Sequence, residues 1–276
     1  MGARLKPIRL KRFPDGESLL TIRPPTAKDV VVIESLDHPD EKLIQLVFAA
    51  DALRRAGAES LTLVAPYLAY MRQDRVFHPG EPRSQQVVGA MLAQTFDRVV
   101  TIEPHLHRTK SIQAVVPSRL MSRALTATPV IARWIRKLAD DTVIVGPDEE
   151  SQPWIAELGR LTGLPTAVGT KRRSGDRSVR VDLPDLGQHS CAVIVDDVAS
   201  SGATIAATAR VLKRKGMRHV AALVVHAIFA PGALTLVRRA GVGTIVSCDT
   251  VQHRTNRVRV APIIAGALNE HEHARS

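Results

Sequence analysis

The sequence is poor in cysteine, in aromatic residues and in long apolar stretches. It has 2 cysteines among 276 residues, and only 3% of its residues are aromatic, which argues against base stacking as the main mode of binding. Cys191 and Cys248 form no C-x-x-C pair, so two packed thiols in a reducing compartment account for them most simply. No apolar run is long enough to cross a bilayer, and the first residues contain no apolar signal-peptide core. We therefore expect a cytoplasmic protein without a membrane partner.

The charge balance is strongly positive, whereas the rest of the composition is that of an ordinary globular protein. Lys and Arg number 38 against 27 Asp and Glu, a formal net charge of +11, and 45% of the residues are hydrophobic. Such a balance attracts polyanions, either nucleic acid or phosphorylated metabolites, although a generally basic surface explains it equally well. Nucleic-acid binding would rest on charge alone, and we expect none.

Short β-branched runs alternate with amphipathic helical stretches along the chain. The expected strands are 30–35, 61–66, 99–104, 142–147, 191–197, 219–229 and 244–250. The expected helices are 40–56, 84–96 with Ser84 as its N-cap, 126–138, 150–162, 202–215 and 231–241. This alternation predicts an α/β fold with two similar domains, each a mostly parallel β-sheet flanked by helices. We place the first domain at 1–124, completed by 261–276, and the second at 125–260.

Acids, a histidine and turn formers directly follow several of these strands. Ligands of open α/β sheets bind beyond the carboxyl ends of the strands, so these positions are candidate site residues. The positions are Pro66-Tyr67, Glu103-Pro104-His105, Gly146-Pro147-Asp148 and Asp196-Asp197.

The most specific of these positions lies in V-I-V-D-D-V-A-S-S-G-A-T-I, residues 193–205. Small residues between a strand and a helix let backbone N–H groups converge at the helix N-terminus, which suits a phosphate. The two preceding carboxylates suit sugar hydroxyls or Mg²⁺, so the combination points to a pentose phosphate. The plain alternative is an N-capped helix after an acidic strand end. The candidate residues are Asp196, Asp197, Ser200, Ser201, Gly202, Ala203 and Thr204.

This segment resembles the ribose-phosphate loop that phosphoribosyltransferases share with ribose-phosphate pyrophosphokinases (PRPP synthetases), and other segments resemble the second family. R-Q-D-R at 72–75 resembles its ATP-binding segment, and R-F-P-D-G-E at 12–17 resembles its loop that reaches a neighbouring subunit's ATP. A solvated loop and an ordinary Pro-Asp-Gly turn are the alternatives. The resemblance implies ATP-binding roles for Phe13, Asp15, Gly16, Glu17, Arg72, Gln73, Asp74 and Arg75.

T-K-R-R at 170–173 resembles the start of the same family's flexible catalytic loop, with the polar S-G-D-R-S following as a lid. The resemblance implies that Lys171 is the catalytic lysine and that Arg173 contacts phosphate, whereas a basic surface loop is the alternative. It also implies that His105 and Asp148 serve Mg²⁺. The stretch 258–268 resembles the family's closing strand and helix, so the resemblance covers nearly the whole chain.

The resemblance implies two phosphoribosyltransferase-like domains and transfer of pyrophosphate from Mg–ATP to ribose 5-phosphate. It further implies a homo-oligomer, a dimer or a hexamer. The family usually carries an acid where this chain has Ser200, and Asp where it has Glu103. An enzyme acting on another phosphorylated sugar, a phosphoribosyltransferase and a non-catalytic regulatory subunit therefore remain alternatives.

Overall fold

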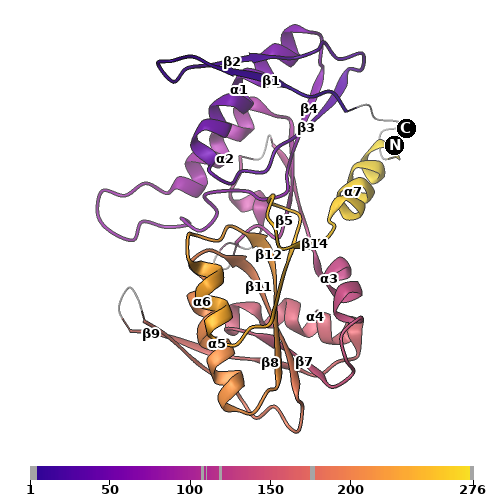
Figure 1. The fold of residues 1–276 in the computed structure, drawn as a ribbon. Coiled ribbons are helices and arrows are strands. Elements are labelled where there is room, and N and C mark those ends of the chain that lie inside the picture. The colour runs from indigo at the N-terminus through magenta and orange to yellow at the C-terminus, as the bar shows by residue number, and fades with distance from the viewer. Residues whose placement is uncertain (1–4, 107–108, 110, 118–119, 175–177, 274–276) are drawn as a thin grey trace. The chain divides into compact units, whose positions relative to one another are not determined.

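The chain divides into two compact units. Residues 1–125 with 262–276 form the first, and residues 126–261 form the second (Figure 1). The computed structural model describes residues 5–106, 109, 111–117, 120–174 and 178–273, with the backbone alone at 171–174, 178–180 and 271–273. The predicted lid residues 175–177 and the end of the polar tail, 274–276, lie outside the described residues.

The first unit is built on a four-stranded parallel sheet. Its strand order is β3 (Asp29–Ile33), β4 (Ser60–Ala65), β5 (Arg98–Ile102) and β6 (Met121–Leu125). Every residue of β4 is buried, as expected for a central strand of a parallel sheet. Helices α1 (Pro39–Arg55) and α2 (Ser84–Thr95) connect successive strands. The closing helix α7 (Ala261–His273) is tied to β6, because Arg123 Nη2 lies 2.6 Å from Glu270 Oε2.

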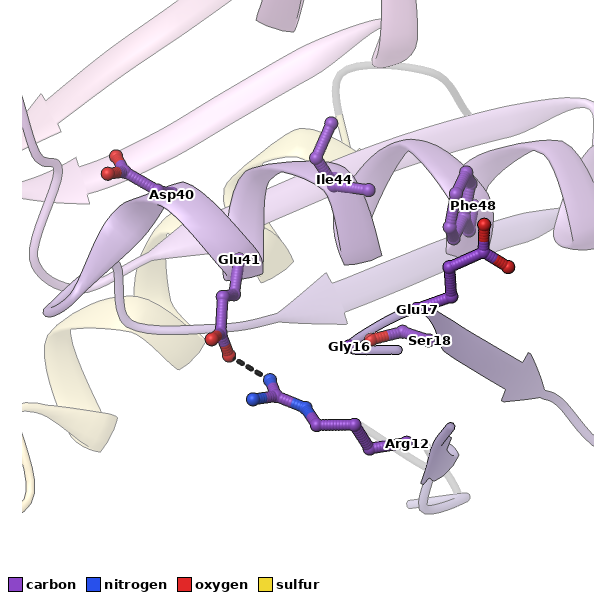
Figure 2. Close-up of a pocket in the computed structure, with 8 residues that line it drawn as sticks. All are labelled: Arg12, Gly16, Glu17, Ser18, Asp40, Glu41, Ile44 and Phe48. Atoms are coloured by element: carbon purple, nitrogen blue, oxygen red, sulfur yellow. Dashed lines mark hydrogen bonds and ion pairs between the residues drawn. The ribbon is translucent and has the colours of Figure 1, made fainter. Parts of the chain in front are cut away.

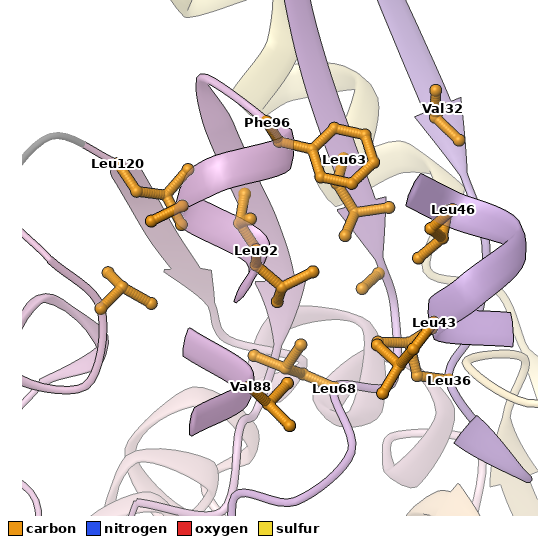
Figure 3. Packing of buried hydrophobic residues seen from close by; sticks show 14 of the residues in the cluster. Val32, Leu36, Leu43, Leu46, Leu63, Leu68, Val88, Leu92, Phe96 and Leu120 are labelled. Atoms are coloured by element: carbon orange, nitrogen blue, oxygen red, sulfur yellow. The ribbon is translucent and has the colours of Figure 1, made fainter. Parts of the chain in front are cut away.

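The core of the first unit lies between the sheet and the two connecting helices (Figure 3). Leu43 and Leu46 recur at helical spacing on α1 and meet Leu63 of β4 and Leu92 of α2. Gly57, at φ +97°, allows the turn that ends α1, a backbone conformation that residues with a Cβ rarely adopt.

The second unit is built on a six-stranded parallel sheet of order β14-β13-β12-β11-β7-β8. The strands are β7 (Thr142–Gly146), β8 (Thr166–Val168), β11 (Cys191–Ala199), β12 (His219–Ala227), β13 (Thr244–Cys248) and β14 (Asn256–Val258). The helices are α3 (Thr128–Ile135), α4 (Gln152–Thr162), α5 (Ala203–Arg214) and α6 (Ala233–Arg239). Figure 1 shows α5 and α6 on one side of this sheet and α3 and α4 on the other. The predicted α/β fold with mostly parallel sheets is thereby confirmed.

Two antiparallel hairpins complete the fold, and the sequence pattern did not indicate either of them. β1 (Arg9–Arg12) pairs with β2 (Ser18–Thr21), and β9 (Thr170–Ser174) pairs with β10 (Ser178–Asp182). All four residues of β1 are exposed, so this strand has no apolar alternation to reveal it. The short strands β6 and β8 were missed as well.

Several predicted boundaries were wrong by a few residues, and the N-cap of α2 was misassigned. Ser84 is the first helical residue, Arg83 holds the N-cap position, and no side chain caps this helix. A carbonyl of the preceding loop serves for one backbone amide, because Gln85 N donates to Gln73 O at 3.2 Å. The Gln85 side chain ties the same loop to the helix, since its Nε2 donates to Met71 O at 3.1 Å. The predicted helix 126–138 is confined to α3, and α4 is preceded by the 3₁₀ turn η2 (Glu149–Ser151).

No described helix combines the length and the apolar character that a bilayer crossing requires. Among the described residues, Cys191 and Cys248 form no disulfide, and Cys248 is fully buried.

We expect Asp97→Asn to destabilise the first unit in a pH-dependent manner. Partial burial raises the pKa of Asp97. The Leu61 amide and the Arg54 guanidinium, each 2.6 Å from Asp97 Oδ2, lower this pKa by more than burial raises it, so the net pKa lies below its usual value. The folded state therefore favours the carboxylate, and this stabilisation is present above the ordinary Asp pKa and lost as the pH falls through the lower folded pKa. After discounting for solvent, the loss at pH 7 is about 1 kcal/mol.

Thermal unfolding between pH 7 and pH 3 checks this expectation. The difference in Tm between the wild type and Asp97→Asn should narrow as the pH falls. Asp51→Asn is the matched control, because Asp51 pairs with Arg55 on the exposed face of α1 and should change Tm little. A Tm difference that stays constant with pH would refute the assigned role of the Asp97 carboxylate.

Candidate active site

The loop after β11 is shaped by Gly202. This residue is the N-cap of α5 and has φ +73°, in the left-handed region. A Cβ at this position would lie 2.8 Å from Val237 Cγ2 and 3.2 Å from Ala233 O, so α6 packs directly against the loop. The backbone conformation and the close contact therefore both require glycine.

The N-cap residue of α5, Gly202, has no side chain to cap the helix, and the first helical amide, Ala203 N, donates only a long hydrogen bond of 3.4 Å to Ser201 Oγ. The first N–H groups of a helix have no partner within the helix, and they carry the positive end of its dipole. Ser200 O accepts a hydrogen bond from Ala230 N at 3.0 Å, which fixes the loop to the segment before α6. Ser200, Ala203 and Thr204 are partly exposed and Ser201 is exposed, so this small-residue turn can receive an anion.

Asp196 and Asp197 lie within β11, which runs two residues further than the predicted strand. Both side chains are half-buried. Asp196 Oδ1 accepts from Asp197 N at 3.0 Å, and Asp197 Oδ1 accepts from Val198 N at 2.7 Å. These local bonds fix two carboxylates a few residues before the turn 200–204. Carboxylate oxygens accept hydrogen bonds from hydroxyl groups.

The 12–17 segment forms the turn of the β1–β2 hairpin. Phe13 N donates to Glu17 O at 2.8 Å, and Glu17 N donates to Asp15 Oδ1 at 3.1 Å. Gly16 has φ +94°, and the Lys11 ammonium lies 5.1 Å from the centre of the Phe13 ring. The turn is therefore an ordered, exposed projection with an aromatic ring beside it.

An open pocket of about 490 Å³ lies between this hairpin and α1 (Figure 2). Its lining residues are Arg12, Gly16, Glu17, Ser18, Asp40, Glu41, Ile44 and Phe48. The ion pair between Arg12 and Glu41 lowers the pKa of the Glu41 carboxyl and raises the pKa of Arg12, mainly through their hydrogen bond. Gly16 and Glu17 are predicted site residues, whereas Arg12, Ser18, Asp40 and Glu41 were not among the predictions. The acidic start of α1, at Asp40 and Glu41, was the available signal.

The R-Q-D-R segment projects from the loop before α2. Arg72, Gln73 and Arg75 are exposed, and the Arg75 guanidinium lies 4.9 Å from the centre of the Phe77 ring. Gln73 N donates to Tyr70 O at 3.2 Å, so a turn precedes the segment. None of residues 72–75 lines the pocket shown in Figure 2.

Tyr70, at the start of that turn, is held in an unusual conformation. Its φ is +65°, and its hydroxyl donates to Asp40 Oδ1 at the start of α1. This hydrogen bond raises the pKa of the Tyr70 hydroxyl, and partial burial adds to the increase. The contact therefore fixes the loop that carries R-Q-D-R against the helix that lines the pocket.

His105 and Asp148 follow β5 and β7 respectively, as predicted from the strand ends, and each is half-buried. His105 belongs to the first unit and Asp148 to the second. Asp148 is the N-cap of η2, and its carbonyl oxygen accepts from Ser151 Oγ at 2.5 Å. Gly146 permits this turn, because a Cβ there would lie 2.1 Å from Ser151 Oγ.

Lys171 and Arg173 lie in β9, and only their backbone is described. Lys171 is opposite Val181 and Arg173 is opposite Val179 in the register with β10. The basic segment is therefore one strand of a hairpin rather than the simple loop that the sequence suggested.

The described residues contain no group of three or more His, Cys, Asp or Glu side chains that could hold a metal ion. Magnesium binds oxygen ligands, usually one or two carboxylates together with water and substrate phosphates. The Asp148 and Asp196–Asp197 carboxylates fit that donor chemistry. The His105 imidazole suits it less well as a direct ligand.

Both parts of the chain match known protein families. Residues 1–95 match the N-terminal domain of ribose phosphate pyrophosphokinase, and residues 123–262 match the phosphoribosyl transferase domain. A ribose-phosphate pyrophosphokinase of Methanopyrus kandleri is 33% identical over 272 residues, which cover 97% of this chain and 92% of that protein. Ribose-phosphate pyrophosphokinase 2 of Archaeoglobus fulgidus is 34% identical over 256 residues, covering 92% of this chain and 88% of that protein.

A solved structure shows the same fold. The phosphoribosylpyrophosphate synthetase of Mycobacterium smegmatis superposes with a TM-score of 0.80 and 22% identity, covering 98% of this chain and 92% of that one. At this identity the likeness establishes the fold alone. Taken with the sequence matches along almost the whole length, it shows that the chain belongs to the ribose-phosphate pyrophosphokinase family.

Proposed function

We propose that the protein transfers pyrophosphate from Mg–ATP to the 1-hydroxyl of ribose 5-phosphate, giving 5-phosphoribosyl 1-pyrophosphate and AMP. The observation that carries this proposal is the match to ribose-phosphate pyrophosphokinases along nearly the whole chain, which includes both domains. A phosphoribosyltransferase would use a loop like 196–204, but it would not require the R-Q-D-R and K-R-R segments as well.

In the reaction, the ribose O1 attacks the β-phosphorus of ATP, and the bond between that phosphorus and the α–β bridging oxygen breaks. AMP leaves with the bridging oxygen, and the proton of the 1-hydroxyl is released. The turn 200–204 would hold the 5-phosphate through the α5 N-terminus, while Asp196 and Asp197 accept hydrogen bonds from ribose hydroxyls. No side chain needs to become covalent, so positioning and charge stabilisation supply the catalysis.

The nucleotide would bind to the first domain, and the sugar phosphate to the second. Arg72 and Arg75 are exposed cations that can neutralise triphosphate oxygens, with Gln73 and Asp74 offering directional hydrogen bonds. The β1–β2 turn would supply Phe13 against the purine, and Asp15 and Glu17 as acceptors, to the ATP of a neighbouring copy. We assign the first domain to 1–124 with 261–276 and the second to 125–260.

Lys171 and Arg173 would stabilise negative charge on the transferred group. Lysine offers a compact ammonium, and arginine offers a planar guanidinium with several N–H donors. Magnesium, when bound with ATP, would neutralise phosphate oxygens and make the β-phosphorus more electrophilic. Asp148 of the second domain offers a carboxylate that suits Mg²⁺, and we also assign a role in the use of Mg²⁺ to His105 of the first domain.

If the β1–β2 turn completes the ATP site of a neighbouring copy, the active protein must be an oligomer, either a dimer or a hexamer. The exposed position of Phe13 and of the turn supports this assignment. Active-enzyme sedimentation should show turnover only in an oligomeric species, and a fully active monomer would contradict it. We also propose a cytoplasmic location, consistent with two cysteines that form no disulfide among the described residues.

The function is tested by measuring AMP release from ATP with a panel of pentose 5-phosphates, with and without excess EDTA. We expect release to depend on ribose 5-phosphate, and to stop with EDTA and resume when Mg²⁺ is restored. Preference for another sugar phosphate would make Ser200 the first residue to examine. Consumption of phosphoribosyl pyrophosphate with a base and without ATP would indicate a phosphoribosyltransferase, and activity only in a mixed complex would indicate a regulatory subunit.

A further inference from the structure

His226 is a buried polar residue for which the proposed mechanism has no use. It lies near the carboxyl end of β12, and only 1% of its surface is exposed. A buried imidazole is costly unless its nitrogens are hydrogen-bonded, so its partners define its role. Its Nδ1 lies 2.9 Å from Oγ1 of Thr250, which is in the turn that follows β13.

The tautomer of His226 follows from the second bond of Thr250. Thr250 Oγ1 donates its hydrogen to Val225 O at 2.7 Å. Because a hydroxyl has one hydrogen, Thr250 Oγ1 must accept from His226, so Nδ1 of the ring carries a hydrogen. Thr250 therefore orients the imidazole and links it to the backbone of β12.

The register of the sheet places His226 beside the end of β11, just before the turn 200–204. Asp196 is opposite Val224, and Val198 is opposite His226. Alternate residues of a strand share a face, so His226 lies on the same face as Val224 and Asp196. Val224 packs in the core with residues of α5 and α6, the helices that Figure 1 shows on that side.

A short chain of bonds connects His226 to the loop itself. His226 O accepts from Ile228 N at 3.1 Å, which closes the turn leaving β12. Ala230 N, in the same segment, donates to Ser200 O at 3.0 Å. The Thr250–His226 contact therefore anchors the segment that holds the first residue of the 200–204 turn.

We propose that His226 is a positioning residue for the sugar phosphate. Held by Thr250, it fixes the 226–230 segment, and through Ser200 it keeps the turn 200–204 in the shape that receives the 5-phosphate. The inference rests on the proposed function, because it assumes that this turn holds that group. It assigns no contact between His226 and the substrate.

The test is calorimetric binding of ribose 5-phosphate and, separately, of Mg–ATP to the full chain. His226→Leu and Thr250→Val should each weaken ribose 5-phosphate binding about tenfold and leave Mg–ATP binding unchanged. His226→Asn, which keeps a donor near the Nδ1 position, and Thr250→Ser, which keeps the hydroxyl, should retain most of the affinity. His219→Asn, at the exposed start of β12, is the matched control.

The outcomes separate the inference from the function on which it rests. Unchanged ribose 5-phosphate affinity in folded Thr250→Val would overturn the inference alone, even if His226→Leu does not fold. Equal loss of affinity for both ligands would also overturn it, because it would indicate a general packing role. A wild-type protein that binds Mg–ATP but no sugar phosphate would overturn the proposed function and the inference with it.

Discussion

Lys171→Ala is expected to lower kcat/KM by about 10³-fold. We expect no other single substitution that leaves the protein folded to lower kcat/KM as much. The transferred group gains charge on oxygens that a fixed ammonium can stabilise, and an alanine offers no replacement donor. Binding of ribose 5-phosphate should change little, because the turn 200–204 and Asp196 form the site that we assign to it. The defect should therefore appear mainly in kcat.

The substitution should also leave the fold intact. β9 and β10 form a two-stranded sheet of their own, outside the six-stranded sheet of the second unit. Lys215→Ala is the control, because Lys215 is an exposed lysine at the end of α5. If Lys171→Ala and Lys215→Ala had similar kinetics, the catalytic assignment of β9 would be wrong.

Gly202→Ala is expected to lower both stability and ribose 5-phosphate affinity. An alanine at φ +73° is strained, and its Cβ would press against Val237 and the carbonyl of Ala233. Together the strain and the overpacking should cost about 2–4 kcal/mol. Relief of the contact would shift the start of α5, so affinity for the sugar phosphate should fall at least about tenfold.

Gly163→Ala separates the two causes. Gly163 ends α4 at φ +76°, but no atom lies within 4 Å of its hypothetical Cβ, so only the backbone strain applies. We expect it to cost about 1 kcal/mol and to leave ligand binding unchanged. Thermal unfolding and calorimetry measure both effects. Equal destabilisation by the two substitutions would show that the contact of the loop with α6 contributes little.

The sequence was most informative where burial imposes a pattern. Strand β4 is buried along its whole length, and β11 begins with the apolar run 191–195. The helices between the strands repeat their apolar residues at helical spacing, so the order of the elements could be predicted. The hairpins could not be predicted in this way, because β1 is fully exposed and β9 consists of T-K-R-R-S. Only β10, S-V-R-V-D, alternates apolar and polar residues, and that run is short.

The candidate site likewise has parts that the sequence pattern predicts and parts that it does not. The turn 200–204 could be predicted because small residues, a glycine and paired acids occur together at a strand end. The pocket beside the β1–β2 hairpin could not, because Arg12 and Glu41 become neighbours only when the hairpin packs on α1. Nothing in the sequence singles out His226, because it is one of two histidines in an otherwise apolar strand. Its bond to Thr250 spans 24 positions.

Phosphorus NMR of the purified protein with Mg²⁺, ATP and ribose 5-phosphate tests the central claim most directly, with Lys171→Ala as the parallel sample. We expect AMP and a new sugar 1-pyrophosphate signal to appear together with the wild type and to be almost absent with the variant. A folded wild type that binds ATP but yields neither signal would contradict the account.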